Sequence, residues 1–342
     1  MKYFYKYTIP AFFIIFILGP APSAPELNKK NIEINIEINE VLEWLKNKES
    51  KIKNIKDDNH SKVIFFDSIP QKTEYSIVYL HGFSGSSEDG APVHEMVARE
   101  LGFNLYLPRL YAHGLDEEEP LLNYTGEKSL DSAREAVAVG KILGKKIILM
   151  GTSTGCSLAL NLANDPKIAA LVMYAPNIKV NHPLAFVATL PWGLQIIRLI
   201  KGGKYHYIDD MTTEKMKYWT HKYRLEAVVQ MQKLIETSMI ESTFNQVTCP
   251  VFSGFYYRNE KEQDQVVSVD HMREMFTKLG TEKNLKEQIS FKNAEKHEIA
   301  SRIANKNYLE VKDSTIVFLK RVLSLWKIII LDFILGLIQE DP

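Results

Sequence analysis

The sequence of 342 residues predicts an α/β fold, in which helices cover both faces of a mostly parallel sheet. From about residue 62, short apolar runs rich in β-branched residues alternate with longer amphipathic runs. That alternation is typical of strand–helix–strand units. In "KKIILMGTSTGCSLAL" (145–160), two apolar runs are joined by a turn in which glycines flank a serine. Such a turn is typical of a strand that leads directly into a helix.

The composition is that of an ordinary globular protein, with 45% hydrophobic and 25% charged residues. Lys and Arg total 42, as do Asp and Glu, so no basic field favours nucleic acid as a partner. The two cysteines fit neither a disulfide framework nor a zinc site. We expect no metal and no cofactor.

Residues 1–25 predict export. Lys2 and Lys6 precede an uncharged stretch over residues 7–25, and these lysines hold the start of the chain in the cytoplasm. One interpretation is a cleaved signal peptide, with Ala21-Pro22-Ser23 as the cleavage site. The other is an uncleaved anchor, just long enough to cross a thin bilayer, which would associate the protein with a membrane through its N-terminus.

Residues 26–61 are predicted to form a linker and a short helix. "NIEINIEINE" (31–40) has a period of two, and its frequent Asn and Glu favour a solvated spacer over an exposed strand. "VLEWLKNKESKI" (41–52) has the pattern of an amphipathic helix.

Residues 62–325 are predicted to form the main domain. Strands are expected at 62–67, 75–80, 103–108, 145–150, 168–175, 249–257 and 287–291. Helices are expected at 92–102, 129–144, 156–165 and 269–280. Residues 177–246 contain no clear strand and are rich in Trp, Tyr, Met and Lys, which indicates a helical insertion.

Residues 326–342 form a very apolar run that is interrupted by Lys327 and Asp332. Because a membrane-spanning helix would bury both charges at a cost of several kcal/mol, we expect a C-terminal helix that packs on the sheet or lies on a membrane surface.

Ser153 has the sequence context of a nucleophile. It lies where the strand at 145–150 turns into a helix, and Gly151 and Gly155 remove side chains that would collide with the flanking elements. The start of the helix directs N–H groups toward an oxyanion formed beside the serine. The alternative, a phosphate-binding turn, is disfavoured because no Lys follows as a P-loop requires.

The base must follow the nucleophile in chain order. His271 falls inside a predicted helix, whereas His297 lies in a loop after the strand at 287–291. Loops at the carboxyl ends of parallel strands commonly carry the chemistry, so His297 is the predicted base.

The acid is expected in the loop after residues 249–257, which offers Glu260, Glu262 and Asp264, with Asp270 further on. Asp264 lies at the end of this loop and is the preferred acid. Glu260 and Glu262 remain the alternatives.

The oxyanion donors are expected to be backbone N–H groups. His81-Gly82-Phe83 follows the apolar strand at 75–80, so the N–H of Phe83 could face the site beside that of Thr154. His81 is predicted to brace this loop and to take no part in the chemistry.

Together, "HGFSGS", "GTSTG", "DQVVS" and the late "EKHE" resemble the α/β-hydrolase superfamily over residues 62–325. "VYLHGFSGSSED" and the helical insertion look like the monoglyceride lipase, lysophospholipase and S33-type serine hydrolase branch. The resemblance implies an eight-stranded, mostly parallel sheet with a small helical cap. Ser153, Asp264 and His297 match the nucleophile, acid and base, and Phe83 and Thr154 match the oxyanion positions.

The sequence departs from that branch in three places. Ala112 in "LYAHGLDEEEP" replaces the first glycine of a usual Gly-His-Gly, and the acid loop "RNEKEQDQVVS" is longer than usual. The second departure weakens the assignment of Asp264. The exported N-terminus is uncommon in the branch and indicates an exported or membrane-anchored bacterial subgroup.

These features predict a serine hydrolase that cleaves carboxylic esters, either small-molecule acyl esters or lipid-like esters, through an acyl-enzyme. The apolar stretch in the insertion is expected to line an acyl pocket with Leu184, Phe186, Leu190, Trp192 and Ile196. An S33-like aminopeptidase is one alternative and would need an acidic clamp, for which "YIDD" (207–210) is the available cluster. A non-catalytic exported binding module on a hydrolase scaffold is the other.

Overall fold

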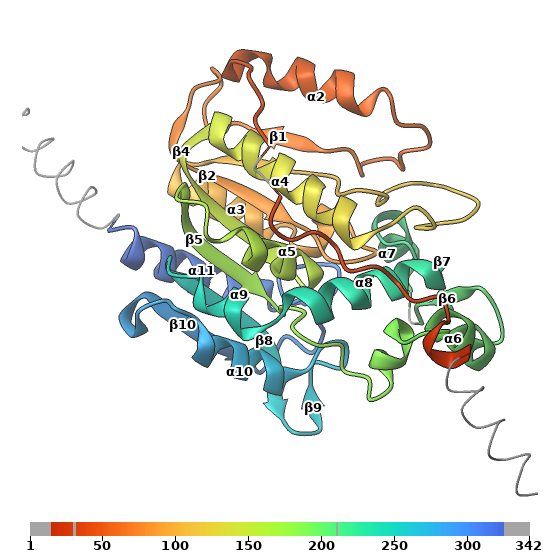
Figure 1. The fold of residues 1–342 in the computed structure, drawn as a ribbon. Coiled ribbons are helices and arrows are strands. Elements are labelled where there is room, and N and C mark those ends of the chain that lie inside the picture. The colour runs from red at the N-terminus through yellow and green to blue at the C-terminus, as the bar shows by residue number, and fades with distance from the viewer. Residues whose placement is uncertain (1–14, 30–31, 210, 325–342) are drawn as a thin grey trace, which may run out of the picture.

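The computed structural model describes residues 15–29, 32–209 and 211–324 (Figure 1). Residues 1–14 of the N-terminal apolar segment and the predicted helix at 326–342 lie outside this range. Within the described ranges, no helix is long and apolar enough to cross a membrane.

The main sheet contains eight strands and is mostly parallel, which confirms the predicted fold class. Along the sheet the order is β1-β3-β2-β4-β5-β8-β10, and β9 pairs with β8. Only β1 and β9 pair in the antiparallel direction. The bounds are β1 (Lys62–Ile64), β2 (Thr73–Leu80), β3 (Asn104–Leu107), β4 (Gly144–Thr152), β5 (Ile168–Tyr174), β8 (Val251–Asn259), β9 (Glu262–Gln263) and β10 (Lys286–Phe291).

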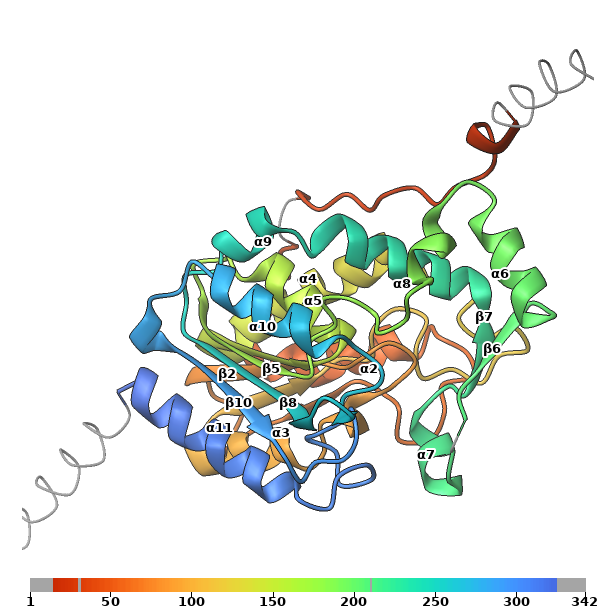
Figure 2. The same ribbon diagram turned by 90° about the horizontal axis from the view of Figure 1, so that it is seen from below.

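Helices cover both faces of the sheet (Figure 2). Along β4 the side chains alternate: Ile147 and Leu149 pack into one hydrophobic cluster, and Ile148 and Met150 into the other. The first cluster lies under α2 (Val41–Glu49), α4 (Gly126–Leu143), α5 (Thr154–Leu162), α9 (Glu241–Asn245) and α10 (Val269–Lys278). The second lies under α3 (Val93–Leu101) and α11 (Tyr308–Val322). Short 3₁₀ turns occur at η1 (Ile38–Glu40), η2 (Ser87–Asp89) and η4 (Lys283–Leu285).

The insertion between β5 and β8 forms the cap. It contains η3 (Ala185–Thr189), α6 (Gly193–Lys201), β6 (Tyr205–Tyr207), α7 (Thr213–Tyr218), β7 (Lys222–Arg224) and α8 (Leu225–Ser238), before α9. Both views show α6, β6, β7 and α7 together on one side of the molecule (Figures 1 and 2). The helical insertion was expected, but the antiparallel β6–β7 ribbon corrects the prediction that it contains no strand. Strands of three residues are too short to show a period in the sequence.

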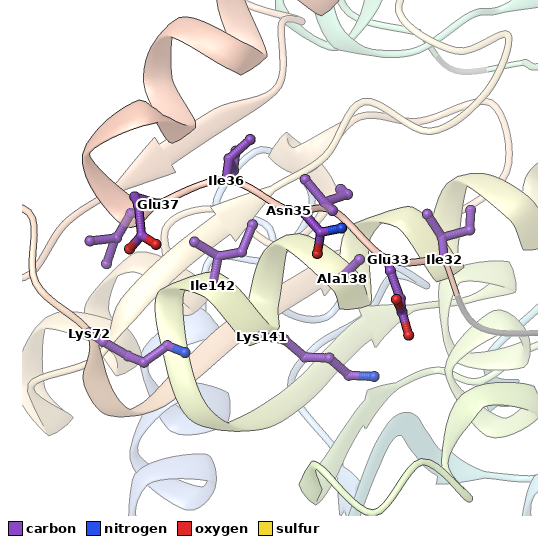
Figure 3. Close-up of a pocket in the computed structure, with 11 residues that line it drawn as sticks. Ile32, Glu33, Asn35, Ile36, Glu37, Lys72, Ala138, Lys141 and Ile142 are labelled. Carbon is purple, nitrogen blue, oxygen red and sulfur yellow. The ribbon is translucent and has the colours of Figure 1, made fainter.

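Residues 32–38 correct the prediction of a solvated spacer. Ile34, Ile36 and Ile38 pack against the hydrophobic cluster, while Glu33 and Asn35 are exposed. The period of two therefore separates a side that packs on the domain from a side that faces solvent. The segment is extended, but it pairs with none of the described strands. Figure 3 shows this segment beside α4, with a pocket of about 560 Å³ between them that is also lined by Lys72, Ala138, Lys141 and Ile142.

Residues 20–29 also lie on the domain surface. The Arg134 guanidinium on α4 donates to the carbonyl oxygens of Leu27 (2.7 Å) and Glu26 (3.4 Å). Lys29 forms ion pairs with Glu127 (2.5 Å) and Asp131 (3.0 Å) on the same helix. This N-terminal strap, residues 20–29, is thus attached to α4 by backbone and side-chain contacts.

Candidate active site

Ser153 occupies a strained turn between β4 and α5. Its backbone has φ 55° and ψ −120°, a region that non-glycine residues rarely adopt. The Ser153 N–H donates to the Tyr174 carbonyl (2.9 Å), and the Ser153 carbonyl accepts from the N–H of Asn177 (3.1 Å) and Cys156 (3.0 Å). The ends of β4 and β5 therefore hold the turn in a conformation that would otherwise relax.

The two glycines around Ser153 allow α5 to pack closely on the end of β2. A Cβ atom at Gly155 would overlap the Leu80 carbonyl oxygen, and one at Gly151 would lie 2.8 Å from the same oxygen. This is the close packing that the sequence pattern predicted.

His297 and Asp264 form a buried hydrogen-bonded pair. The distance from His297 Nδ1 to Asp264 Oδ2 is 2.6 Å, and both side chains are largely buried. Asp264 Oδ1 accepts from the N–H groups of Val266 (2.8 Å) and Val267 (3.1 Å), which orient the carboxylate. Asp264 follows β9 and His297 follows β10, so the pair lies at the edge of the sheet where β4 delivers Ser153.

Two opposing influences act on the His297 imidazole. Burial lowers its pKa, but the charge of Asp264 and the hydrogen bond to it raise the pKa, and the net result lies above 6.5. His297 Nε2 is buried and has no hydrogen-bond partner among the described residues, so no such bond joins it to Ser153. Without substrate, such catalytic hydrogen bonds are often long.

The alternative base and acids lie elsewhere. His271 is on α10, where its ring nitrogens contact Ser268 and Lys179. Glu260 and Glu262 are exposed and bond to neighbours on the β8–β9 hairpin. Asp270 is exposed in the first turn of α10. The structure therefore brings only Asp264, of the acids considered, to His297.

The loop after β2 carries the predicted oxyanion donor. Among the described residues, the N–H groups of Phe83 and Thr154 donate no hydrogen bond, so both are available to a ligand. The Phe83 ring packs edge-on against His113, Tyr124 and Tyr223, with centroid distances of 5.0–5.9 Å.

His81 braces this loop, as predicted. Its Nε2 accepts from the Leu110 N–H (3.1 Å), and its Nδ1 therefore carries the proton that faces the Gly82 carbonyl (2.9 Å). Burial, with a smaller contribution from His113, holds the pKa of His81 well below 6.5, so the ring stays neutral.

A buried network that the sequence analysis missed lies behind the nucleophile. Asp89 Oδ2 accepts from the Gly82 N–H (2.6 Å), and Asp89 Oδ1 accepts from the Tyr79 hydroxyl (2.5 Å). The same hydroxyl lies 2.7 Å from Thr152 Oγ1. Gly82 precedes Phe83, and Thr152 precedes Ser153, so one carboxyl group connects the oxyanion loop to the nucleophile turn. Burial raises the pKa of Asp89 to about 8, which keeps it neutral at pH 7.

Nothing in the sequence marked Asp89 for this role, because a carboxylate in "SSEDG" is usually a solvated turn residue. The available signal was its distance of seven residues from Gly82, which is short enough for a tight loop to return its side chain.

The cap contacts the catalytic loops through residues 215–220. The Thr220 N–H donates to the Ser84 carbonyl (2.8 Å), and Lys215 pairs with Glu298, the residue after His297, at 3.1 Å. These two contacts join the cap to the oxyanion loop and to the base loop. Neither contact could be predicted from the sequence pattern.

The five residues predicted to line an acyl pocket lie on η3, on α6 and in the segment around them, and η3 and α6 pack on each other and on α8. Leu184 and Phe186 are each 52% exposed, and the Trp192 indole donates to the Ile15 carbonyl oxygen (3.1 Å). Leu190 and Ile196 are half-buried. A pocket role for this group stays a prediction. The described residues contain no group of three or more His, Cys, Asp or Glu side chains that could hold a metal ion.

The comparisons with known proteins agree with this fold. Residues 77–244 match the model of the alpha/beta hydrolase family. With this match and the eight-stranded sheet, the chain has the α/β-hydrolase fold. No curated protein matches the chain in sequence.

Solved structures show the same fold at low identity. One, from work on the metagenome-derived lipolytic enzymes LipS and LipT, has a TM-score of 0.63 and 15% identity, and the match covers 78% of this chain and all of that one. Est1E of Butyrivibrio proteoclasticus, with ferulic acid bound, has a TM-score of 0.53 and 18% identity, covering 80% and 100%. The monoacylglycerol lipase of Paleococcus ferrophilus has a TM-score of 0.52 and 13% identity, covering 76% and 98%.

Proposed function

We propose that this protein is a serine hydrolase that cleaves lipid-like or other acyl esters through a covalent acyl-enzyme. The observation that carries the proposal is the buried Asp264–His297 pair, which lies at the sheet edge where Ser153 is held at positive φ. A strained serine beside an oriented imidazole is the arrangement that activates a hydroxyl nucleophile.

The residues divide the reaction between them. Ser153 Oγ attacks the ester carbonyl carbon while His297 Nε2 takes the hydroxyl proton, and Asp264 stabilises the resulting imidazolium. The carbonyl oxygen becomes an oxyanion that accepts from the N–H groups of Phe83 and Thr154. Collapse of this intermediate breaks the bond to the leaving alkoxide, to which His297 returns the proton. Water, deprotonated by His297, then attacks the acyl carbonyl carbon. The bond between this carbon and Ser153 Oγ breaks, His297 returns the proton to Oγ, and the carboxylic acid is released.

Ester substrates are favoured over peptides by two observations. Two of the structural neighbours are described as lipolytic enzymes and as a monoacylglycerol lipase. Asp209, in the acidic cluster that an aminopeptidase would need as a clamp, is exposed to solvent. A non-catalytic binding module would have no use for a buried, oriented imidazole.

Labelling with a fluorophosphonate tests the proposal without knowledge of the substrate. The wild-type chain should be labelled on the peptide that contains Ser153, and Ser153→Ala should abolish the label. The control is Ser290→Ala, which changes an exposed serine on β10 and should be labelled like wild type. Folded wild-type protein that resists the reagent would refute an activated serine.

A further inference from the structure

The cap exposes large aliphatic side chains to solvent. Leu199 and Ile200, at the end of α6, are 84% and 64% exposed, and Leu199 is the most exposed large hydrophobic residue of the described chain. Lys201 and Lys204 follow them and are also exposed. A helix that shows an apolar side bordered by lysines has the character of helices that lie in a membrane interface.

A second group of exposed aliphatic residues lies beside α6. Ile15, Ile17 and Leu18 are 62%, 67% and 79% exposed, and residues 15–17 are helical. Figure 2 shows this short helix next to the segment that leads into α6. We call these three residues, with Leu199 and Ile200, the apolar face.

Trp192 joins the two groups. Its backbone N–H donates to the Pro20 carbonyl (2.9 Å), and its indole N–H donates to the Ile15 carbonyl (3.1 Å). Its ring packs so closely on Gly19 that a Cβ there would overlap it. The N-terminal residues are therefore seated at the start of α6.

The sequence before Ile15 indicates what covers this face. Residues 7–14 are uncharged and continue the apolar run into residues 15–18, with Lys2 and Lys6 before them. The chain thus passes from this apolar segment into the domain at the apolar face itself. An occupant that accepts this segment and the aliphatic residues of α6 together must be apolar, extended and tolerant of lysines at its border.

We propose that residues 1–25 stay uncleaved and that the apolar face docks on a lipid bilayer. The docking is inferred only from the exposed residues and the Trp192 contacts. If the proposed function is right, the bilayer would also supply the ester substrate, and this second step rests on the proposed function.

An environment-sensitive label on the full chain tests the docking. In a Cys249→Ala background, where Cys156 is buried, an NBD label is attached at Leu199→Cys. The matched control is Val317→Cys on α11, which is 59% exposed. With phosphatidylcholine–phosphatidylglycerol vesicles, emission at position 199 should shift to the blue and be quenched by nitroxide lipids, while the label at 317 should not respond.

Three outcomes would overturn the proposal. The label at 199 could stay in water although the chain floats with the vesicles. It could shift without lipid in proportion to protein concentration, which would assign the face to a second copy. It could also shift without lipid at any concentration, which would assign the face to a segment of the same chain.

Activity provides the second test. The double variant Leu199→Asp/Ile200→Asp should hydrolyse a long-chain ester embedded in vesicles at least about tenfold more slowly, with a soluble short-chain ester unaffected. Ile69→Asp, at another exposed aliphatic residue (74%), should change neither rate. Equal loss on both esters, or on neither, would contradict docking. Absence of esterase activity in the wild type would refute the proposed function and leave the label result to decide the docking.

Discussion

At the scale of single residues, the Asp264–His297 pair determines where the enzyme should work on the pH scale. The base must be neutral, and its pKa lies above 6.5 because the neighbouring carboxylate outweighs burial. We therefore expect kcat/KM to be lost as the pH falls through a value above 6.5, since protonation removes the base.

Asp264→Asn removes the charge that raises this pKa. Burial then acts alone, so the acidic limb of the profile should move to lower pH while its plateau falls by at least about 10³. Glu262→Gln, on the same hairpin, should change neither the acidic limb nor the plateau of the pH profile. The measurement is kcat/KM against pH for both variants and the wild type. A damaging Glu262→Gln would show that the acid is assigned wrongly.

Asp89 has the opposite character, since it is neutral below about pH 8. Above that pH its charge would lie behind the loop that must stabilise an oxyanion, so kcat should decline. The titratable groups that interact with it are Tyr79, His297, Glu298 and Cys156. In Asp89→Asn the amide oxygen accepts from the Gly82 N–H, and the amide NH₂ donates to the Tyr79 hydroxyl oxygen, whose own proton then faces Thr152 Oγ1. The variant thus keeps the shape and both contacts without the charge, and should remove the decline between about pH 8 and 10.

Asp89→Ala serves as the contrast to that variant. It leaves the Gly82 N–H unpaired and removes one of the two partners of the Tyr79 hydroxyl, at a cost of about 1–3 kcal/mol, and should lower kcat at every pH with little change in KM. Steady-state kinetics of the two variants separates charge from positioning. An alkaline decline that survives in Asp89→Asn would assign it to another group.

At the scale of secondary-structure elements, the sequence predicted those strands and helices whose hydrophobic residues recur with a clear period. The strands β2, β4 and β5 and the helices α3 and α10 were found because their patterns are long enough to distinguish a period of two from one of 3.6. Ser153 and His297 followed from their positions after predicted strands. Asp89 and Lys215 did not, because their partners are brought near only by the folded chain.

The segment 32–38 shows a second limit. Its Asn and Glu residues led to the prediction of a solvated spacer, although its isoleucines pack on the core. Ile36→Asn should therefore lower the free energy of unfolding by about 1 kcal/mol, through lost apolar burial. Asn35→Asp, at the exposed neighbouring position, should lower it much less. The two variants are compared by urea unfolding. Equal unfolding midpoints would contradict the packing of Ile36 and support the original prediction of a solvated spacer.

At the scale of the whole molecule, the two N-terminal lysines and the apolar run predict that the domain lies beyond the cytoplasmic membrane. Alkaline phosphatase fused after residue 30 should be active, and a reporter that functions only in the cytoplasm should be silent at the same position. The reverse pattern would contradict export. Mass spectrometry of the mature N-terminus would then distinguish a cleaved signal peptide from an anchor.

The N-terminal strap has a mechanical consequence. A flexible linker of ten residues has a root-mean-square end-to-end distance of about 17 Å, so it would allow the domain to move by that much relative to its point of attachment. Residues 20–29 allow no such slack, because Arg134 and Lys29 fasten them to α4 and Trp192 holds Pro20. Residues 15–29 are therefore held against the domain at both ends. If the apolar face docks on a bilayer as proposed, the fold sets the distance from that bilayer to Ser153.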